Sequence, residues 1–163
     1  MHSRDFVHLD IKHDNILLDG SLRPKLADFG FTQKVTGPIR DFRRTEEYAA
    51  PEVLAQTAPF DGKKADIYSM GVVFYSFFMC KYPSKYGPLS LPDDISDTIK
   101  NIIKAMLSRD PANRPSAADL KGDPWFQTST LSQKDYDFYM DIAEDRTRKF
   151  MQKKSQTPSA YAG

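Results

Sequence analysis

The stretch VHLDIKHDNILL, residues 7–18, is the most informative part of this 163-residue chain. It places a carboxylate (Asp10), a lysine (Lys12) and an amide (Asn15) close together between apolar residues. Two short, largely apolar runs, residues 16–18 and 25–27, flank a turn-like Asp-Gly-Ser. This pattern predicts two short strands that hold polar loop residues at their ends.

Three motifs in a fixed order indicate a family. The segment from His8 to Asn15 resembles the catalytic loop of eukaryotic-type protein kinases, H-R-D-x-x-x-x-N. Residues 28–30, Asp-Phe-Gly, match that family's metal-binding triplet, and residues 50–52, Ala-Pro-Glu, match the end of its activation segment. Each tripeptide alone is weak evidence, but all three in order are specific. The resemblance covers about residues 2–127 and implies the large lobe of a Ser/Thr-type catalytic domain.

The resemblance implies a role for each candidate site residue. Asp10 would be the catalytic base that accepts or orients the proton of a substrate hydroxyl. Lys12 would reach the transferred phosphate of ATP, and a lysine there is typical of Ser/Thr kinases. Asn15 and Asp28 would hold Mg²⁺ through hard oxygen ligands. Thr45 would bond Asp10 and Lys12 and favour Ser/Thr hydroxyl acceptors.

A plainer interpretation exists for these residues. In an isolated D-x-K-x-x-N, the carboxylates would more often be loop caps and the lysine would be solvated. Thr45 could equally be an ordinary loop residue. The downstream motifs favour the functional interpretation.

Other matching positions are expected to be structural. His8 would be a structural histidine packed near Phe29, not a metal ligand, and Gly30 would complete the triplet. No second histidine lies at ligand spacing, and His13 has no obvious partner in the sequence.

Two buried charges also follow from the resemblance. Glu52 and Arg114 would form a buried ion pair that ties the activation segment to the lobe. Asp66 lies in an apolar helix, where a charge needs partners. The family supplies backbone amides of the catalytic loop, and Gly71 completes the D-x-x-S-x-G pattern around Asp66.

The chain also departs from the family. No Gly-rich loop, strand lysine or helix glutamate precedes His8, so the chain resembles most of a large lobe with the small lobe missing. By itself it is expected to be inactive; whether Met1 is the true start stays open. Leu9 stands where the family usually has an arginine that binds a phosphate on the activation loop. Leucine cannot hydrogen-bond a phosphate, so activity in a complete parent is not expected to depend on a phosphate bound at this position. Arg44 replaces a glycine, and His13 replaces a common proline.

The expected fold is mainly α with a few short strands (α+β), like a protein kinase large lobe. Residues 1–127 would form the partial catalytic domain, residues 128–154 a charged helical extension and residues 155–163 a disordered tail. Apolar residues predict helices over residues 63–80 and 94–107, and Ser96 or Asp94 could cap the second of these. Pro51 is expected to begin a short helix over residues 51–55, and Ser116 to cap one over residues 116–120. Residues 32–50 and 82–94 are expected to be loops. The second helix is apolar all round and is therefore expected to be buried.

Composition narrows the class of partners. Twenty-three basic and 22 acidic residues nearly balance, so neither nucleic acid nor an anionic membrane is an expected partner. The one cysteine, Cys80, is expected to be a buried thiol in a reducing compartment. No signal peptide is visible. The expected location is the cytoplasm or the nucleus, with a protein substrate and a possible regulatory protein; the oligomeric state stays open.

Two functions from different classes remain. The first is a protein serine/threonine kinase that uses ATP and Mg²⁺, represented by a fragment. The second is a catalytically inactive, kinase-derived module that binds other proteins through the large lobe.

Overall fold

The computed structural model describes residues 1–20, 23–40, 45–84 and 87–127. Its helices are α1 (Pro51–Ala55), α2 (Gly62–Met79), α3 (Asp97–Met106), α4 (Ala117–Gly122) and α5 (Pro124–Gln127). Its strands are β1 (Phe6–Val7), β2 (Ile16–Leu18), β3 (Pro24–Leu26) and β4 (Gln33–Lys34). Short 3-10 helices span His2–Arg4, His13–Asn15, Glu46–Tyr48 and Pro111–Asn113. This is a mainly helical α+β arrangement. The predicted extension over 128–154, the predicted tail over 155–163 and Arg44 lie outside the described residues.

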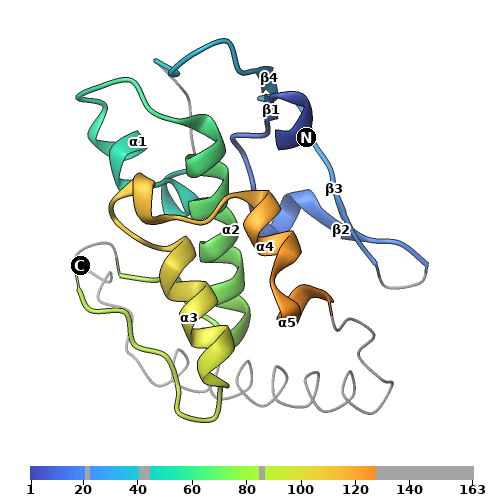
Figure 1. Cartoon of the computed structure of the whole chain (residues 1–163), viewed down its shortest axis with the longest axis vertical. Coiled ribbons are helices and arrows are strands. Elements are labelled where there is room, and N and C mark those ends of the chain that lie inside the picture. The colour runs from blue at the N-terminus through green and yellow to red at the C-terminus, as the bar shows by residue number, and fades with distance from the viewer. Residues whose placement is uncertain (21–22, 41–44, 85–86, 128–163) are drawn as a thin grey trace, which may run out of the picture.

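Helix α2 is the centre of the molecule, with α3 alongside it (Figure 1). It begins where the sequence predicts, because the Asp61 carboxylate accepts hydrogen bonds from the backbone N–H groups of Lys63 at 2.8 Å and Lys64 at 3.3 Å. Gly71 lets α3 approach closely, since a Cβ there would lie 2.9 Å from the Cβ of Met106.

The burial of α2 is less complete than its composition predicts. Its first half is buried, including Ile67 and Val72. Near its C-terminal end, however, Phe77 is 50% exposed, so the expectation of burial on every side is wrong for the last turns. Cys80 ends the helix in the left-handed conformation (φ 49°) and is half-buried, not the fully buried thiol expected.

Two other helices have clear caps. The Ser96 hydroxyl accepts the N–H of Ile99, so α3 starts after Ser96 and not at Asp94. Ser116 and Asp119 form a reciprocal capping box at α4, which confirms Ser116 as the cap.

The strands form two small antiparallel sheets. β2 pairs with β3, with Ile16 opposite Leu26, as the two flanking runs predict. β1 pairs with β4, and Ile39 bridges Phe60. Residues 32–50 are therefore not a structureless loop in their described part, because short extended segments pair with distant backbone.

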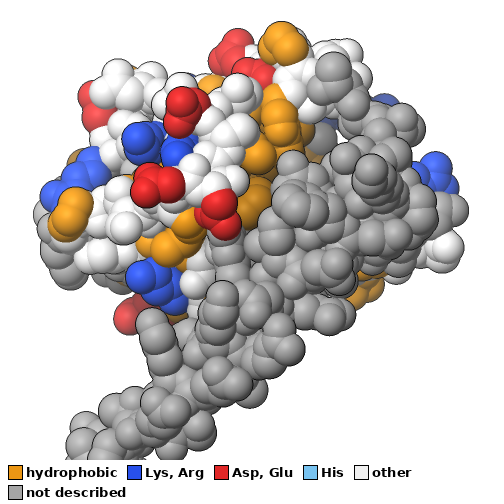
Figure 2. Space-filling view, turned by 90° about the horizontal axis from the view of Figure 1, so that it is seen from below, with side chains coloured by type: hydrophobic (Ala, Val, Ile, Leu, Met, Phe, Trp, Pro, Cys, Tyr) orange, Lys and Arg blue, Asp and Glu red, His pale blue; other side chains and the backbone are white. Residues whose placement is uncertain are grey.

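Three apolar clusters form the core around α2. One joins β1 and the activation-segment region to the first half of α2, for example through Val7 and Tyr48. The others join α2 to α3, and α2 to α4 and α5, through Ile103 and Met106. Seen from below, the described surface shows hydrophobic side chains gathered between charged ones (Figure 2). Within the described ranges, no helix has both the length and the hydropathy needed to span a bilayer.

Candidate functional site

The loop between β1 and β2 is held from below by one carboxylate. Asp66, 2% exposed in the second turn of α2, accepts the backbone N–H of His8 at 2.8 Å and that of Leu9 at 2.7 Å. The ring of His2 lies 2.9 Å from the same carboxylate. Leu9 has φ 64°, a conformation that costs a branched residue free energy and persists only where surrounding contacts hold it. Asp66 therefore fixes the loop, as the resemblance implies.

Leu9 itself points to packing and not to anion binding. Its side chain is 9% exposed and belongs to the apolar cluster that contains Val7 and Tyr48. An aliphatic side chain offers no hydrogen-bond donor, so this position contributes only apolar contacts.

Asp10, Lys12 and Thr45 meet in space. The Thr45 hydroxyl donates to Asp10 Oδ1 at 2.9 Å, and the Lys12 ammonium lies 2.8 Å from Asp10 Oδ2. Lys12 also donates to the Thr45 hydroxyl at 3.5 Å. The structure thus brings together three residues that are separated by up to 35 positions in the sequence.

Asn15 supports Asp10 from the other side. Its amide nitrogen donates to the backbone oxygen of Asp10 at 2.8 Å and to its carboxylate at 3.0 Å. Burial alone would raise the pKa of Asp10, but hydrogen bonds from Lys12, Thr45 and Asn15 outweigh it, so the pKa lies below its ordinary value. The hydrogen bond to Asp10 raises the pKa of Lys12. Both groups are therefore charged at neutral pH.

Asn15 and Asp28 lie at the same open end of the β2–β3 hairpin. The backbone N–H of Ala27 donates to the backbone oxygen of Asn15 at 2.8 Å, which places Asp28 next to it. Asp28 is exposed, has φ 55°, and accepts the N–H of Gly30 through Oδ1 at 3.1 Å. Its negative charge contributes to raising the pKa of Lys12, so the two side chains lie within electrostatic range.

Asn15 and Asp28 offer the few oxygen ligands that suit Mg²⁺, and not a full set of protein ligands for a metal. With its amide nitrogen bonded to Asp10, Asn15 has its amide oxygen left for a cation, and Asp28 adds a carboxylate. Mg²⁺ commonly takes one or two protein oxygens and keeps several waters. The described residues contain no group of three or more His, Cys, Asp or Glu side chains placed to hold a metal.

His8 has the structural role expected of it. Its Nε2 lies 3.0 Å from the backbone oxygen of Ala27, and its Nδ1 accepts the N–H of Asp10 at 3.3 Å. Its ring is tilted against that of Phe29 with centroids 5.3 Å apart. His8 therefore links the two loops that carry Asp10 and Asp28.

His13, for which the sequence offers no obvious partner, has two side-chain partners in the structure. Its Nδ1 lies 2.8 Å from the Tyr48 hydroxyl, and its Nε2 lies 3.2 Å from the Ser76 hydroxyl. Tyr48 in turn lies 3.2 Å from the Tyr82 hydroxyl. These partners are 34 to 63 positions apart, and no periodic pattern marks such distances.

The hydrogen bonds that link these four side chains have a single direction when the His13 imidazole is neutral. Ser76 has one hydroxyl hydrogen, and the backbone oxygen of Val72 at 2.6 Å is its nearest acceptor. His13 must then donate from Nε2 to Ser76 and accept at Nδ1 from Tyr48, which accepts from Tyr82. Burial raises the pKa of Tyr48, so its phenol keeps the hydrogen that it donates.

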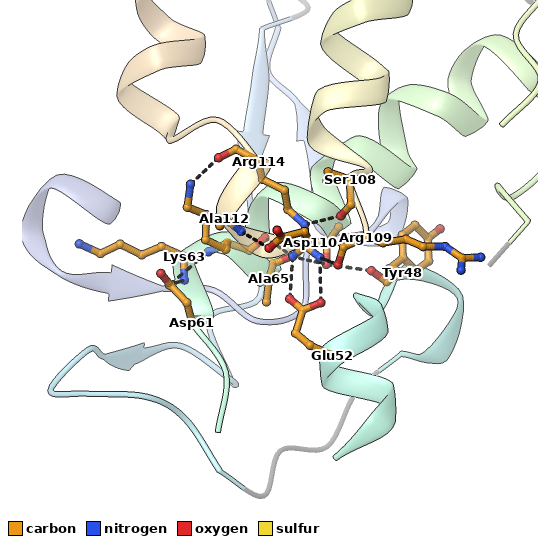
Figure 3. Close-up of polar contacts among 12 residues, drawn as sticks. Tyr48, Glu52, Asp61, Lys63, Ala65, Ser108, Arg109, Asp110, Ala112 and Arg114 are labelled. Carbon is orange, nitrogen blue, oxygen red and sulfur yellow. Dashed lines mark hydrogen bonds and ion pairs between the residues drawn. The ribbon is translucent and has the colours of Figure 1, made fainter. Parts of the chain in front are cut away.

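Arg114 joins three segments beneath the site (Figure 3). Its guanidinium donates to both carboxylate oxygens of Glu52, at 2.6 and 2.8 Å, and to the backbone oxygens of Lys64 at 3.0 Å and Ser108 at 2.8 Å. The Arg114 side chain is fully buried, whereas that of Glu52 is 21% exposed. The expected ion pair is present, and it is bidentate. The Arg114 guanidinium carbon also lies over the ring of Tyr68, 4.9 Å from the ring centroid.

The comparisons with known proteins agree with this geometry. A family model described as the protein kinase domain matches residues 1–126. A probable serine/threonine-protein kinase from Dictyostelium discoideum is 34% identical over 139 residues, 77% of this chain and 17% of the relative. The serine/threonine-protein kinase SIK1 from Rattus norvegicus is 34% identical over 149 residues, 82% of this chain and 19% of the relative. Sucrose non-fermenting protein kinase 1 from Fusarium virguliforme is 33% identical over 143 residues, 78% of this chain and 20% of the relative. The matched part is thus about a fifth of each relative's length.

Proposed function

This chain belongs to the protein kinase family, and from that premise we propose that it carries the phosphoryl-transfer residues of a serine/threonine kinase. The reaction would pass the γ-phosphoryl group of ATP to a Ser or Thr hydroxyl of a protein. One observation carries the proposal: the Asp10 carboxylate accepts a hydroxyl hydrogen from Thr45 while the Lys12 ammonium lies 2.8 Å from it. A carboxylate that binds a hydroxyl beside a fixed cation is what this reaction needs.

Each residue has a definite task in this proposal. Asp10 orients the acceptor hydroxyl and takes its proton, since its lowered pKa keeps it ionised at neutral pH. Lys12 neutralises charge on the transferred group. Asn15 and Asp28 would hold Mg²⁺, which would supply stabilisation of the negative charge on ATP. Thr45 holds Asp10 and Lys12 in register and supports the preference for Ser and Thr acceptors.

Phosphorylation would not control activity through a phosphate bound at position 9. Leu9 offers no donor to a phosphate, so activity would not depend on a phosphate bound at that position. A large loss of activity on phosphatase treatment, restored by a phosphate within residues 32–45, would contradict this expectation.

The test is a transfer assay with a matched pair of variants. Radiolabelled ATP, Mg²⁺ and a mixed protein substrate are incubated with the 163-residue chain and with the longest product encoded at its locus. In the longer product, Asp10→Asn is expected to lower transfer by about 10²–10⁴-fold, because it removes the base. Asp14→Asn, an exposed change in the same loop, is expected to leave transfer nearly unchanged.

Three results would count against the proposal. Transfer that survives Asp10→Asn, or phosphotyrosine as the main product, would contradict the assigned roles. A longer product without transfer or ATP binding would support the alternative, a kinase-derived binding module. For the 163-residue chain alone we expect neither turnover nor micromolar binding of ATP with Mg²⁺, which calorimetry measures directly.

A further inference from the structure

His13 connects three elements that surround the proposed phosphoryl-transfer residues. From the catalytic loop, its Nδ1 lies 2.8 Å from the hydroxyl of Tyr48, and its Nε2 lies 3.2 Å from the hydroxyl of Ser76 in α2. The kinase family commonly has a proline at this position, and proline has no polar side-chain atom. The family pattern therefore does not account for this connection.

Helix α2 closes a ring of contacts among the three elements. The Ser69 hydroxyl donates to the backbone oxygen of Tyr48 at 2.9 Å, the nearer of its two acceptors. Tyr48 is 5% exposed, and its ring lies edge-on to that of His13 with centroids 5.7 Å apart. Tyr48 is thus held at its backbone by α2 and at its hydroxyl by the catalytic loop.

The position of Tyr48 also fixes that of Thr45. The two residues belong to one turn, because the backbone N–H of Tyr48 donates to the backbone oxygen of Thr45 at 3.2 Å. At the other end of this turn, the Thr45 hydroxyl donates to Asp10 at 2.9 Å. The turn over residues 45–48 is therefore attached to the catalytic loop at two points, and His13 supplies the second of them.

An acceptor hydroxyl has to reach Asp10 beside this turn. The Asp10 side chain is only 4% exposed, whereas that of Lys12 is 23% exposed and Thr45 is half-buried. Lys12 and Thr45 both contact the Asp10 carboxylate, so they border the narrow opening above it. A displacement of about 1 Å in a group that positions a substrate can cost a large factor in rate. The turn that carries Thr45 therefore needs a fixed position.

From these contacts we propose that His13 is a positioning residue for the protein acceptor. It holds the turn over residues 45–48 in place, so that Thr45 borders Asp10 in a constant position when the acceptor binds. His13 acts through Tyr48 and not through contact with the reacting atoms. The proposal rests on the proposed kinase function and adds to it a residue that the family's motif does not contain.

His13→Pro is the most direct variant, because it restores the family's common residue. His13 is the first residue of a 3-10 helix, a position that tolerates proline. Lys12 before it is extended (φ −156°, ψ 169°), as the residue before a proline prefers to be. The variant is therefore expected to fold while it loses both hydrogen bonds of the imidazole.

Steady-state kinetics on the longest product encoded at the locus test the role. The acceptor is one peptide that the wild type selects from a degenerate mixture of Ser- and Thr-containing peptides, and ATP is varied separately. His13→Pro is expected to raise the KM for the peptide by about 3–10-fold, the factor that corresponds to one hydrogen bond. The KM for ATP is expected to stay unchanged, since the turn borders the acceptor side of Asp10.

Two further variants identify the bond that matters. His13→Asn keeps an amide oxygen that can accept from Tyr48, and it is expected to recover most of the peptide KM. Tyr48→Phe removes the same bond from the other side. The double variant with His13→Pro is therefore expected to raise the peptide KM no further than Tyr48→Phe alone.

Ser116→Ala is the control for a loss of stability alone. Ser116 caps α4, which supplies none of the contacts in this ring, and the loss of such a cap costs about as much stability as the loss of one hydrogen bond. Both KM values are expected to stay as in the wild type. In the 163-residue chain, hydrogen–deuterium exchange of residues 46–49 is expected to become at least about threefold faster in His13→Pro and to stay unchanged in Ser116→Ala.

Three outcomes would overturn the proposal while the wild type transfers phosphate normally. The first is an unchanged peptide KM in His13→Pro. The second is an equal rise in the KM values for peptide and ATP, and the third is an equal effect of His13→Pro and Ser116→Ala. A wild type that transfers no phosphate would instead overturn the proposed function, and the role of His13 would fall with it.

Discussion

At the scale of single residues, the site depends on hydrogen bonds that each have a defined direction. Asp10 receives hydrogens from Thr45, Lys12 and Asn15, and it has no hydrogen of its own to give while its pKa stays low. The hydrogen bonds through His13 also have a defined direction, because Ser76 donates its one hydrogen to the backbone oxygen of Val72. A change that removes one member leaves a neighbour without its partner.

His13→Ala tests this second chain. It removes the link between Tyr48 and Ser76, and we expect a loss of about 1 kcal/mol in the free energy of unfolding, measured with denaturant. Nitrogen NMR of the wild type should show an imidazole that is protonated at Nε2 and unprotonated at Nδ1. Tyr48→Phe should shift the Nδ1 signal, because it removes the hydroxyl 2.8 Å away.

The comparison variant is Asp14→Ala in the adjacent position, which is exposed and should change neither stability nor the histidine signals. An imidazole protonated at Nδ1 and not at Nε2 would show that the hydrogens run in the opposite direction.

At the scale of elements, contact between α2 and α3 depends on the absence of a side chain. A Cβ at Gly71 would lie 2.9 Å from the Cβ of Met106 and 3.1 Å from the Leu107 side chain. The first of these atoms is attached directly to the backbone, so it cannot move without moving α3. The glycine thus sets the separation of the two helices.

Gly71→Ala should therefore destabilise the protein by about 1–3 kcal/mol, the usual cost of overpacking, as measured by thermal unfolding. Gly122→Ala is the control within another helix, since a Cβ there meets nothing within 4 Å. Alanine favours helix, so this second variant should unfold at the same temperature or slightly higher. Equal losses in both variants would contradict the close approach at Gly71.

At the scale of the whole molecule, Arg114 connects the segments that surround α2. Its guanidinium binds Glu52 of α1, the backbone of α2 at Lys64 and the backbone after α3 at Ser108. Removing it takes the paired cation from Glu52 and one donor each from the backbone oxygens of Lys64 and Ser108. We expect Arg114→Met to cost about 3 kcal/mol, at the lower end of the range for buried pairs because Glu52 keeps some exposure to water.

A surface ion pair provides the contrast. Lys63 lies 2.7 Å from Asp5, with both side chains partly or largely exposed. Lys63→Ala should change the unfolding midpoint in urea much less than Arg114→Met, because water replaces such a pair easily. If the two variants unfolded at the same urea concentration, the buried pair would not have the role assigned to it.

Local signals predicted much of this fold from the sequence. The Ser116 cap, the Pro51 helix and the β2–β3 hairpin depend on neighbouring residues, so the sequence alone predicts them. The sequence left Asp94 and Ser96 open as caps of α3, because both residue types cap helices well, and the structure shows Ser96 as the cap. The pairing of β1 with β4 joins two-residue strands, which are too short to carry a periodic pattern.

The candidate site, too, could be predicted only in part. Its chemical groups were found because they form contiguous motifs, and the structure then brought Thr45 to Asp10 and Lys12. The contacts of His13 were missed because its two partners lie on distant segments and its residue type departs from the family pattern. Contacts that depend on tertiary packing need coordinates, however specific the motif beside them.

The anchors of the site also differ from their targets in the order in which a ribosome makes them. Asp66 is synthesised 57 residues after Leu9, and Arg114 is synthesised 62 residues after Glu52. At the usual 5–20 residues per second, each target waits roughly 3–12 s for its anchor. The loop that carries Asp10 is therefore synthesised before the carboxylate that holds it. This part of the site can form only after Asp66 of α2 has been synthesised.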